Sequence, residues 1–118
     1  MKAILINAIL QTITEIEIND WSEISPAIGC DLFTCVRIDN VNTLYVDDEG
    51  LLRETNHFFS YNDTKLAGNG LILGNNAGGE SVDTILNVED VKGRVEFHGE
   101  ETCVVPPIRI YSFDDLEF

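Results

Sequence analysis

The strongest constraint on the fold is a series of short apolar segments separated by turn-forming residues over residues 28–83. Residues 32–38 and 43–46 are rich in β-branched and aromatic side chains, and a cluster of turn-forming residues at 39–42 joins them. Glycines bracket a further apolar strand at residues 71–73. The pattern predicts short strands joined by tight turns, and it contains no catalytic motif.

The N-terminal part predicts a hairpin followed by a short helix. Residues 3–9 form a continuous apolar run that suits a strand buried on both faces, and the alternation over residues 13–18 suits a strand with one wet face. Asp20, with Glu23 three residues on, predicts the start of a helix over residues 21–28.

Two residues near the end of that helix bear on how it stops. Pro26 lies too deep for the first helical position, so it is expected to limit the helix or distort its last turn. Gly29 can then close the helix in a left-handed conformation.

The C-terminal part predicts one more short helix and late strands. Asn87 is expected to cap a helix over residues 88–93, with strands at 95–97 and 103–111 and a tail at 113–118 that frays. We therefore expect one domain over all 118 residues, of the α+β class, mainly antiparallel sheet with one or two short helices.

The charge balance is far from ordinary. The chain has 21 acidic and 7 basic residues and a net charge of −14. Such a surface repels nucleic acids and anionic membranes, so we expect neither as a partner. It could bind a basic protein or imitate DNA, and the simpler interpretation is that the acidity keeps the protein in solution.

The cysteines and the N-terminus indicate a cytoplasmic protein. Cys30, Cys35 and Cys103 form no C-x-x-C pair, and their odd number argues against a disulfide framework. The first ten residues are too short and too poor in basic residues for a secretory signal, and no stretch approaches the ~20 apolar residues of a membrane span. The expected location is a bacterial cytoplasm.

Possible catalytic and metal-binding groups have simpler explanations. The acidic turn at residues 47–50 is typical of a hairpin turn rather than of a cation site, and no metal is expected. The three cysteines, with His57 and His98, contain the parts of a thiol nucleophile and base, but packing is the expected role of the cysteines. The sequence therefore predicts a protein that is not an enzyme and carries no cofactor.

One segment combines aromatic and basic residues in a way that suits a nucleotide. Aromatic rings stack on bases and guanidinium groups pair with phosphates, and the glycines near residue 70 could bring backbone N–H groups to a ligand. The alternatives are a loop with its phenylalanines folded inward and two ordinary turns flanking a strand. The candidate ligand-binding residues are Arg37, Arg53, Asn56, Phe58, Phe59, Tyr61, Lys65, Gly68, Asn69 and Gly70.

Several motifs together resemble a known family. These are the opening MKAILI strand, the I-G-C corner, the L-Y-V-D-D-E-G-L-L turn, Asn56 and the L-A-G-N-G-L-I-L-G strand. Over residues 1–83 they resemble a domain-of-unknown-function family of small phage, plasmid and mobile-element proteins. The I-G-C corner departs from the double glycine of that family, which has no established catalytic residues to transfer.

The resemblance implies a setting rather than an activity, namely a phage-like accessory protein acting against bacterial defence. The leading hypothesis is a non-catalytic sponge, a homo-oligomer that sequesters a nucleotide-type immune signal such as a cyclic nucleotide or a cyclic ADP-ribose-like molecule. The alternative is an acidic DNA mimic or protein-binding inhibitor of a host nuclease or restriction enzyme. A structural or regulatory module of a larger phage complex is the third hypothesis.

Overall fold

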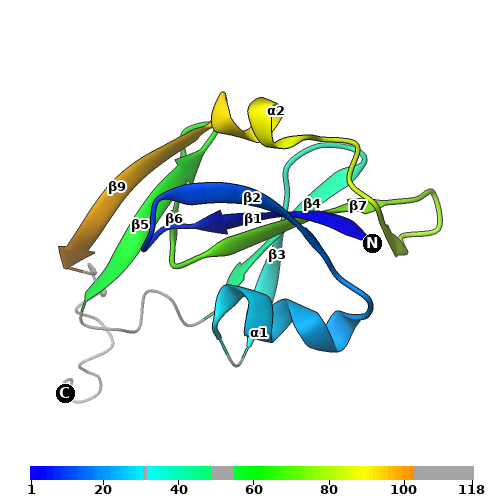
Figure 1. The fold of residues 1–118 in the computed structure, drawn as a ribbon, viewed down its shortest axis with the longest axis horizontal. Helices are drawn as coiled ribbons and strands as arrows, with labels where there is room; N and C mark the ends of the chain where they lie inside the picture. The colour runs from blue at the N-terminus through cyan, green and yellow to red at the C-terminus, as the bar shows by residue number, and fades with distance from the viewer. Residues whose placement is uncertain (31, 49–54, 103–118) are drawn as a thin grey trace, which may run out of the picture.

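The computed structural model describes residues 1–30, 32–48 and 55–102, which form two antiparallel β-sheets and short helices (Figure 1). In chain order the elements are β1 (Lys2–Asn7), β2 (Thr12–Glu17), the 3₁₀ helix η1 (Trp21–Glu23), α1 (Ile24–Ile28), β3 (Phe33–Arg37), β4 (Asn42–Asp47), β5 (Thr55–Tyr61), β6 (Thr64–Ala67), β7 (Gly70–Asn75), β8 (Ser81–Val82), α2 (Val88–Lys92) and β9 (Val95–Thr102).

The two sheets differ in size. The large sheet has the strand order β2-β1-β7-β4-β3, with the two-residue strand β8 added beside β7. The small sheet has the order β6-β5-β9. Each pair of neighbouring strands is antiparallel, in agreement with the predicted mainly antiparallel sheet.

The large sheet is buried on both faces, which explains its unbroken apolar strands. One face packs against the small sheet, and Ile4, Leu44 and Ile72 form a core there with Phe59 of β5. The opposite face packs against η1 and α1, where Ala3, Ile18, Ile24, Ile28, Tyr45, Leu71 and Leu73 form a second core. Apolar residues at consecutive positions are needed because both faces of a central strand are inside.

The predicted helix after Asp20 is present but divided. Asp20 accepts a hydrogen bond from the Ser22 amide, and Gly29 closes α1 at φ 75°, so both predicted ends are confirmed. The carboxylate of Glu23 accepts from the amide of Asn19 rather than that of Asp20. The segment starts as a 3₁₀ turn and becomes α-helical from Ile24, and Pro26 is the third residue of that α-helix.

The second predicted helix is confirmed together with its cap. The Asn87 side chain accepts from the Asp90 amide at 2.8 Å, and the Asp90 carboxylate accepts from the Asn87 amide at 3.1 Å. This reciprocal pair is a capping box, so the Asp90 side chain adds a second hydrogen bond to the predicted Asn87 cap.

The fold prediction is confirmed in its coarser form. The structure is mostly antiparallel sheet with a couple of short helices, and it is more sheet-rich than the label α+β conveys. None of the described helices has the length and apolar character that crossing a bilayer would require. The predicted strand at 103–111 and the tail at 113–118 lie outside the described residues.

Candidate functional site

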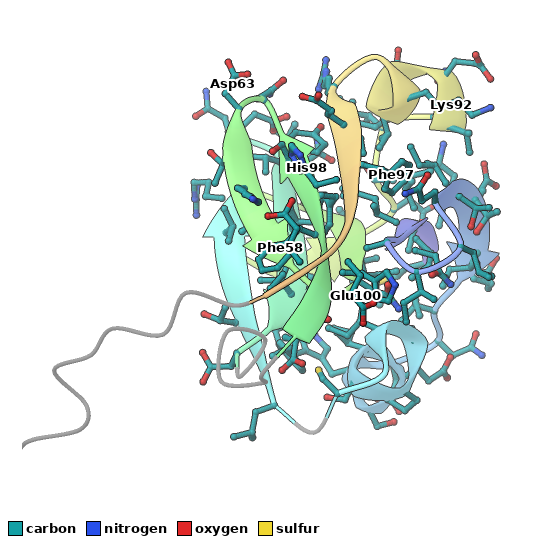
Figure 2. The ribbon with its side chains drawn as sticks, turned by 90° about the vertical axis from the view of Figure 1, so that its left-hand side faces the viewer. Phe58, Asp63, Lys92, Phe97, His98 and Glu100 are labelled. Carbon is teal, nitrogen blue, oxygen red and sulfur yellow. The ribbon has the colours of Figure 1, made fainter. Side chains whose placement is uncertain are left out.

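The predicted ligand-binding residues occupy four different parts of the fold. Phe59 and Tyr61 are buried between the sheets, Phe58 is buried in a small cluster with Ala67, and Gly70 is buried within β7. Figure 2 views the small sheet from its outer side, with Phe58 and His98 on that face and Phe97 directed inward. Arg53 lies outside the described residues.

Three of the predicted residues do come together. Asn56, Gly68 and Asn69 line a cavity of about 200 Å³ with Ile9, Ile28, Gly29 and Asp47. The side-chain oxygen of Asn69 accepts from the Ala8 amide at 2.8 Å, and the Gly68 amide donates to the His57 carbonyl at 2.7 Å. These hydrogen bonds join the β6–β7 turn to β5 and to the end of β1, so the cavity has a fixed wall.

Lys65 is already engaged with neighbours. Its ammonium group lies 2.7 Å from a carboxylate oxygen of Glu101 and 5.0 Å from the centre of the Phe58 ring. A phosphate at this position would have to displace the carboxylate.

Arg37, by contrast, has no ion pair within the described part of the chain. It is exposed on β3, where it lies opposite Thr43 of β4. Because side chains alternate along a strand, Arg37 shares one face of the sheet with Phe33 and Cys35. Lys2 and Arg94 likewise have no ion pair among the described residues, so what suggests a binding role for Arg37 is its place beside a cavity.

This arginine borders a hollow of about 360 Å³, which we call the Trp21–Arg37 cavity; its lining residues are Trp21, Cys35, Arg37, Thr43, Tyr45, Asn75 and Gly79. Small-molecule sites commonly measure about 300–1,000 Å³. The cavity lies on the face of the large sheet that also carries η1, beyond the part that the helical segment covers.

Aromatic contacts hold one wall of the cavity in place. The ring of Trp21 packs edge-on to Tyr45 at 5.9 Å between centroids, and Phe33 packs edge-on to Tyr45 at 5.4 Å. Trp21 nevertheless remains 51% exposed. Edge-to-face packing fixes the orientation of an aromatic ring, so Trp21 offers a positioned ring surface next to Arg37.

The floor of the cavity carries polar groups from the neighbouring strands β4 and β7. The hydroxyl of Thr43 donates to the side-chain oxygen of Asn75 at 2.8 Å, and the Tyr45 hydroxyl lies 3.4 Å from the Ser81 hydroxyl. These side chains can accept or donate hydrogen bonds to a ligand, and they give the cavity no general base.

Cys35 is the one cysteine in the lining. Partial burial raises the pKa of its thiol, so the thiol is protonated at neutral pH. A protonated thiol is a poor nucleophile. No histidine or carboxylate is among the described residues that line the cavity, so its chemistry favours binding over catalysis.

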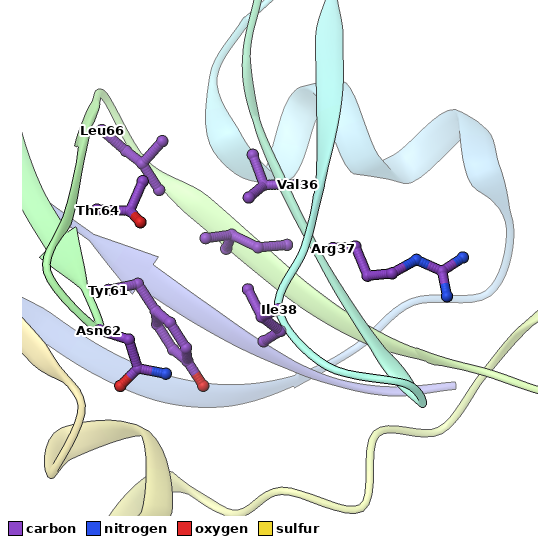
Figure 3. A pocket seen from close by; sticks show the side chains of 8 residues that line it. Val36, Arg37, Ile38, Tyr61, Asn62, Thr64 and Leu66 are labelled. Atoms are coloured by element: carbon purple, nitrogen blue, oxygen red, sulfur yellow. The ribbon is translucent and has the colours of Figure 1, made fainter.

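The opposite face of β3 borders a second, smaller space whose lining is partly apolar and partly polar. Figure 3 shows Val36, Ile38, Tyr61 and Leu66 gathered around a space of about 120 Å³ between β3 and the β5–β6 hairpin, with Arg37 pointing away from it. The arginine head therefore belongs to the Trp21–Arg37 cavity.

One nucleophile–base contact was not anticipated. The Ser60 hydroxyl lies 2.7 Å from Nε2 of His98 on the outer face of the small sheet. Among the described residues no carboxylate hydrogen bonds to this histidine to orient it, which a catalytic pair would require. The contact lies beside a register shift between β5 and β9, so we assign it a role in holding the two strands together there. The described residues also contain no group of three His, Cys, Asp or Glu side chains that could hold a metal ion.

Sequence reasoning missed Trp21 and the polar floor. Trp21 could have been identified from the sequence, because the chain's single tryptophan directly follows the capping residue Asp20 and so begins an exposed helical turn. No signal could have placed Asn75 next to Thr43, because that contact depends on the register of β4 against β7.

A family profile described as a domain of unknown function (DUF3846) matches residues 1–96. The chain belongs to the DUF3846 family. The match extends beyond residues 1–83, over which the sequence motifs resembled such a family. No curated protein and no solved structure matches the chain. The Trp21–Arg37 cavity lies entirely within the DUF3846 domain.

Proposed function

We propose that this DUF3846 protein binds a nucleotide-type small molecule in the Trp21–Arg37 cavity and does not transform it. The observation that carries the proposal is the pairing of an exposed, positioned indole ring with an arginine that has no carboxylate partner among the described residues. A base would stack on Trp21 and a phosphate would pair with Arg37.

The rest of the lining supports a nucleotide over other anions. Thr43, Asn75 and Tyr45 supply hydrogen-bonding groups at the floor, as a ribose or base edge requires. The net charge opposes any anion at long range, but at physiological salt the Debye length is only about 8 Å. Contacts inside the cavity therefore decide affinity for a small ligand.

The biological role that we propose is the sequestration of an immune signal. The motifs resemble those of small phage and mobile-element proteins, and a cavity with no histidine or carboxylate in its described lining suits a sponge. A cyclic nucleotide or a cyclic ADP-ribose-like molecule is the proposed ligand class, a homo-oligomer the proposed form, and the cytoplasm of a bacterial host the proposed location.

The first test combines ligand discovery with two variants. The purified protein is heat-denatured and released small molecules are identified by mass spectrometry, while thermal shift is followed against cyclic dinucleotides, cyclic trinucleotides and cyclic ADP-ribose isomers. We expect at least one ligand to stabilise the fold with a saturating dose dependence. Arg37→Glu should weaken its binding about tenfold or more, because it removes a charge-assisted hydrogen bond.

The matched control is Lys92→Glu, the same charge change on α2 in another part of the fold. It should leave affinity unchanged, whereas Trp21→Ala should weaken binding about fivefold or more by removing the stacking surface. Equal losses in Arg37→Glu and Lys92→Glu would mean that overall charge, and not the cavity, governs binding. If Trp21→Ala bound the ligand with unchanged affinity, the ligand would not bind in the Trp21–Arg37 cavity.

The second proposal remains an acidic inhibitor that imitates DNA. It requires carboxylates arranged in a row at phosphate-like spacing. The exposed carboxylates of the described residues are spread over β2, α2, β9 and several turns and connecting segments, among them those with Asp20, Asp39, Asp48, Asp63, Glu80 and Asp83, rather than along one element, so this proposal ranks second.

A further inference from the structure

The two sheets pack face to face, and their edge strands do not hydrogen bond to each other, so an opening lies between the sheets on each side. On one side, the edge strands β3 and β6 border the space of about 120 Å³ shown in Figure 3. On the other side, the edge strands β2 and β9 border a groove of about 460 Å³. We call this larger opening the β2–β9 groove; its lining residues are Gln11, Thr12, Ile13, Thr14, Lys92, Val95 and Phe97.

The strands on either side of the groove both have unpaired outer edges. No described strand hydrogen bonds to the outer edge of β2 or to that of β9. Unpaired strand edges present backbone N–H and C=O groups, which can accept an additional strand. Near one end of the groove a Cβ added at Gly99 would lie 3.9 Å from Nε2 of Gln11, so the residue before β2 approaches β9 there.

Three apolar residues form the inner part of the groove. Ile13, Val95 and Phe97 are partly buried and pack against the core between the sheets. Figure 2 shows Phe97 directed toward the interior beside α2, where Lys92 is labelled. An occupant with alternating apolar side chains could direct them onto this surface while its backbone pairs with an edge strand.

The rim of the groove is acidic. The elements that border it carry Glu15 on β2, Glu89 and Asp90 on α2, and Glu96 on β9, all exposed. The basic residue in the groove lining is Lys92, and its ammonium group already lies 3.7 Å from a carboxylate oxygen of Glu89. The charge on this rim therefore favours a basic occupant, and a second copy of a chain with net charge −14 is disfavoured.

We propose that the β2–β9 groove binds an extended, basic segment of a partner protein, which adds as a strand to one of the two edges. Apolar side chains of the segment would contact Ile13, Val95 and Phe97, and its lysine or arginine side chains would face the acidic rim. The proposal is independent of the Trp21–Arg37 cavity, which lies on the other face of the large sheet.

The test uses three labelled heptapeptides and fluorescence anisotropy on the full chain. The probe is acetylated Lys-Val-Lys-Val-Lys-Val-Lys. The second peptide replaces the central valine by proline, which keeps the charge but removes an N–H and blocks strand pairing. The third replaces every lysine by glutamate. We expect the probe to bind about tenfold more tightly than the proline peptide, and the acidic peptide not to bind.

Two single charge reversals locate the site. Glu15→Lys on the rim should weaken binding of the probe about fivefold, whereas Glu80→Lys in the β7–β8 turn should leave it unchanged. In ¹⁵N NMR spectra the probe should shift amide signals of residues 12–17 and 95–101. Equal affinity for the proline peptide, equal effects of the two variants, or shifts confined to other residues would overturn the proposal. Self-association by sedimentation with these same amides protected would assign the groove to a second copy instead.

Discussion

Two glycines of β7 differ in what surrounds their α-carbons. A Cβ at Gly70 would lie 2.9 Å from Leu44 Cδ1 and from Phe59 Cζ, both side-chain atoms. A Cβ at Gly74 would lie 2.4 Å from the backbone carbonyl oxygen of Asp83. A side chain can shift within the core, whereas the backbone at Asp83 is held by the neighbouring hydrogen bond from the Thr84 amide to the Lys2 carbonyl.

We therefore predict that Gly74→Ala destabilises the fold more than Gly70→Ala. Overpacking in a core costs about 1–3 kcal/mol, so Gly70→Ala should fall in this range and Gly74→Ala at its upper end or above. Urea unfolding followed by tryptophan fluorescence measures both. Gly78→Ala, in an exposed turn with its nearest contact at 3.4 Å, is the control and should cost little. A larger loss for Gly70→Ala would contradict the placement of residue 83 against β7.

At the scale of elements, a hydrogen-bond chain, buried at Thr84 and Asn42, joins the β3–β4 turn to the segment before α2. Thr84 donates to the side-chain oxygen of Asn42 at 2.6 Å, and the Asn42 amide donates to Asp39 at 3.0 Å. Burial alone would raise the pKa of Asp39, but hydrogen bonds from Asn42 and from the Val41 amide hold it below its usual value. The Asp39 contribution to stability is therefore present above the ordinary carboxyl pKa and is lost as the pH falls below it.

Removing the centre of this chain should be costly. Asn42 is 1% exposed, and Asn42→Ala would leave the hydroxyl of Thr84 without its acceptor. We predict a loss of about 1–3 kcal/mol in unfolding free energy, measured by urea denaturation at pH 7. Asn40→Ala, at an exposed position in the same turn, should change stability by less than about 0.5 kcal/mol. Equal effects from the two substitutions would show that the buried contact does not stabilise the fold.

At the scale of the whole molecule, the net charge opposes folding. With a net charge of −14, the carboxylates repel one another more strongly in the compact folded state, and dissolved salt screens that repulsion. We predict that raising sodium chloride from 20 to 300 mM increases the melting temperature by a few degrees, equivalent to about 1 kcal/mol or less. Choline chloride should act similarly, because screening does not depend on the cation. Stabilisation by one cation alone would indicate a specific ion site instead.

Much of the fold could be predicted because its signals are local. The β1–β2 and β3–β4 hairpins follow from alternation and turn residues, and Gly29 and Asn87 mark helix ends by their own chemistry. The strands β5 and β6 were not predicted. Residues 55–61 mix polar and aromatic side chains, and the register shift between Phe58 and Phe59 interrupts the period of two in their pairing with β9.

The candidate site was predicted less well, for a related reason. Arg37 was identified as a cation worth attention, but its neighbour Trp21 lies sixteen positions earlier and reaches it only through the packing of η1 against the large sheet. Phe59 and Tyr61 were expected to contact a ligand and lie in the core, because alternation directs both of them toward the large sheet. Their placement follows from which face of the small sheet is covered, and that is a tertiary property.

The acidic residues on the outer strands have a consequence for aggregation. Open sheet edges are where folded proteins recruit one another into fibrils, and charged side chains on those edges are a common protection. Glu15 and Glu17 on β2 and Glu96 on β9 act as such gatekeepers while they are ionised. Near the isoelectric point of about 4.1 the net charge of the protein vanishes. At such a pH the edge strands of neighbouring molecules would no longer repel one another, and the protein would be prone to ordered self-assembly through these edges.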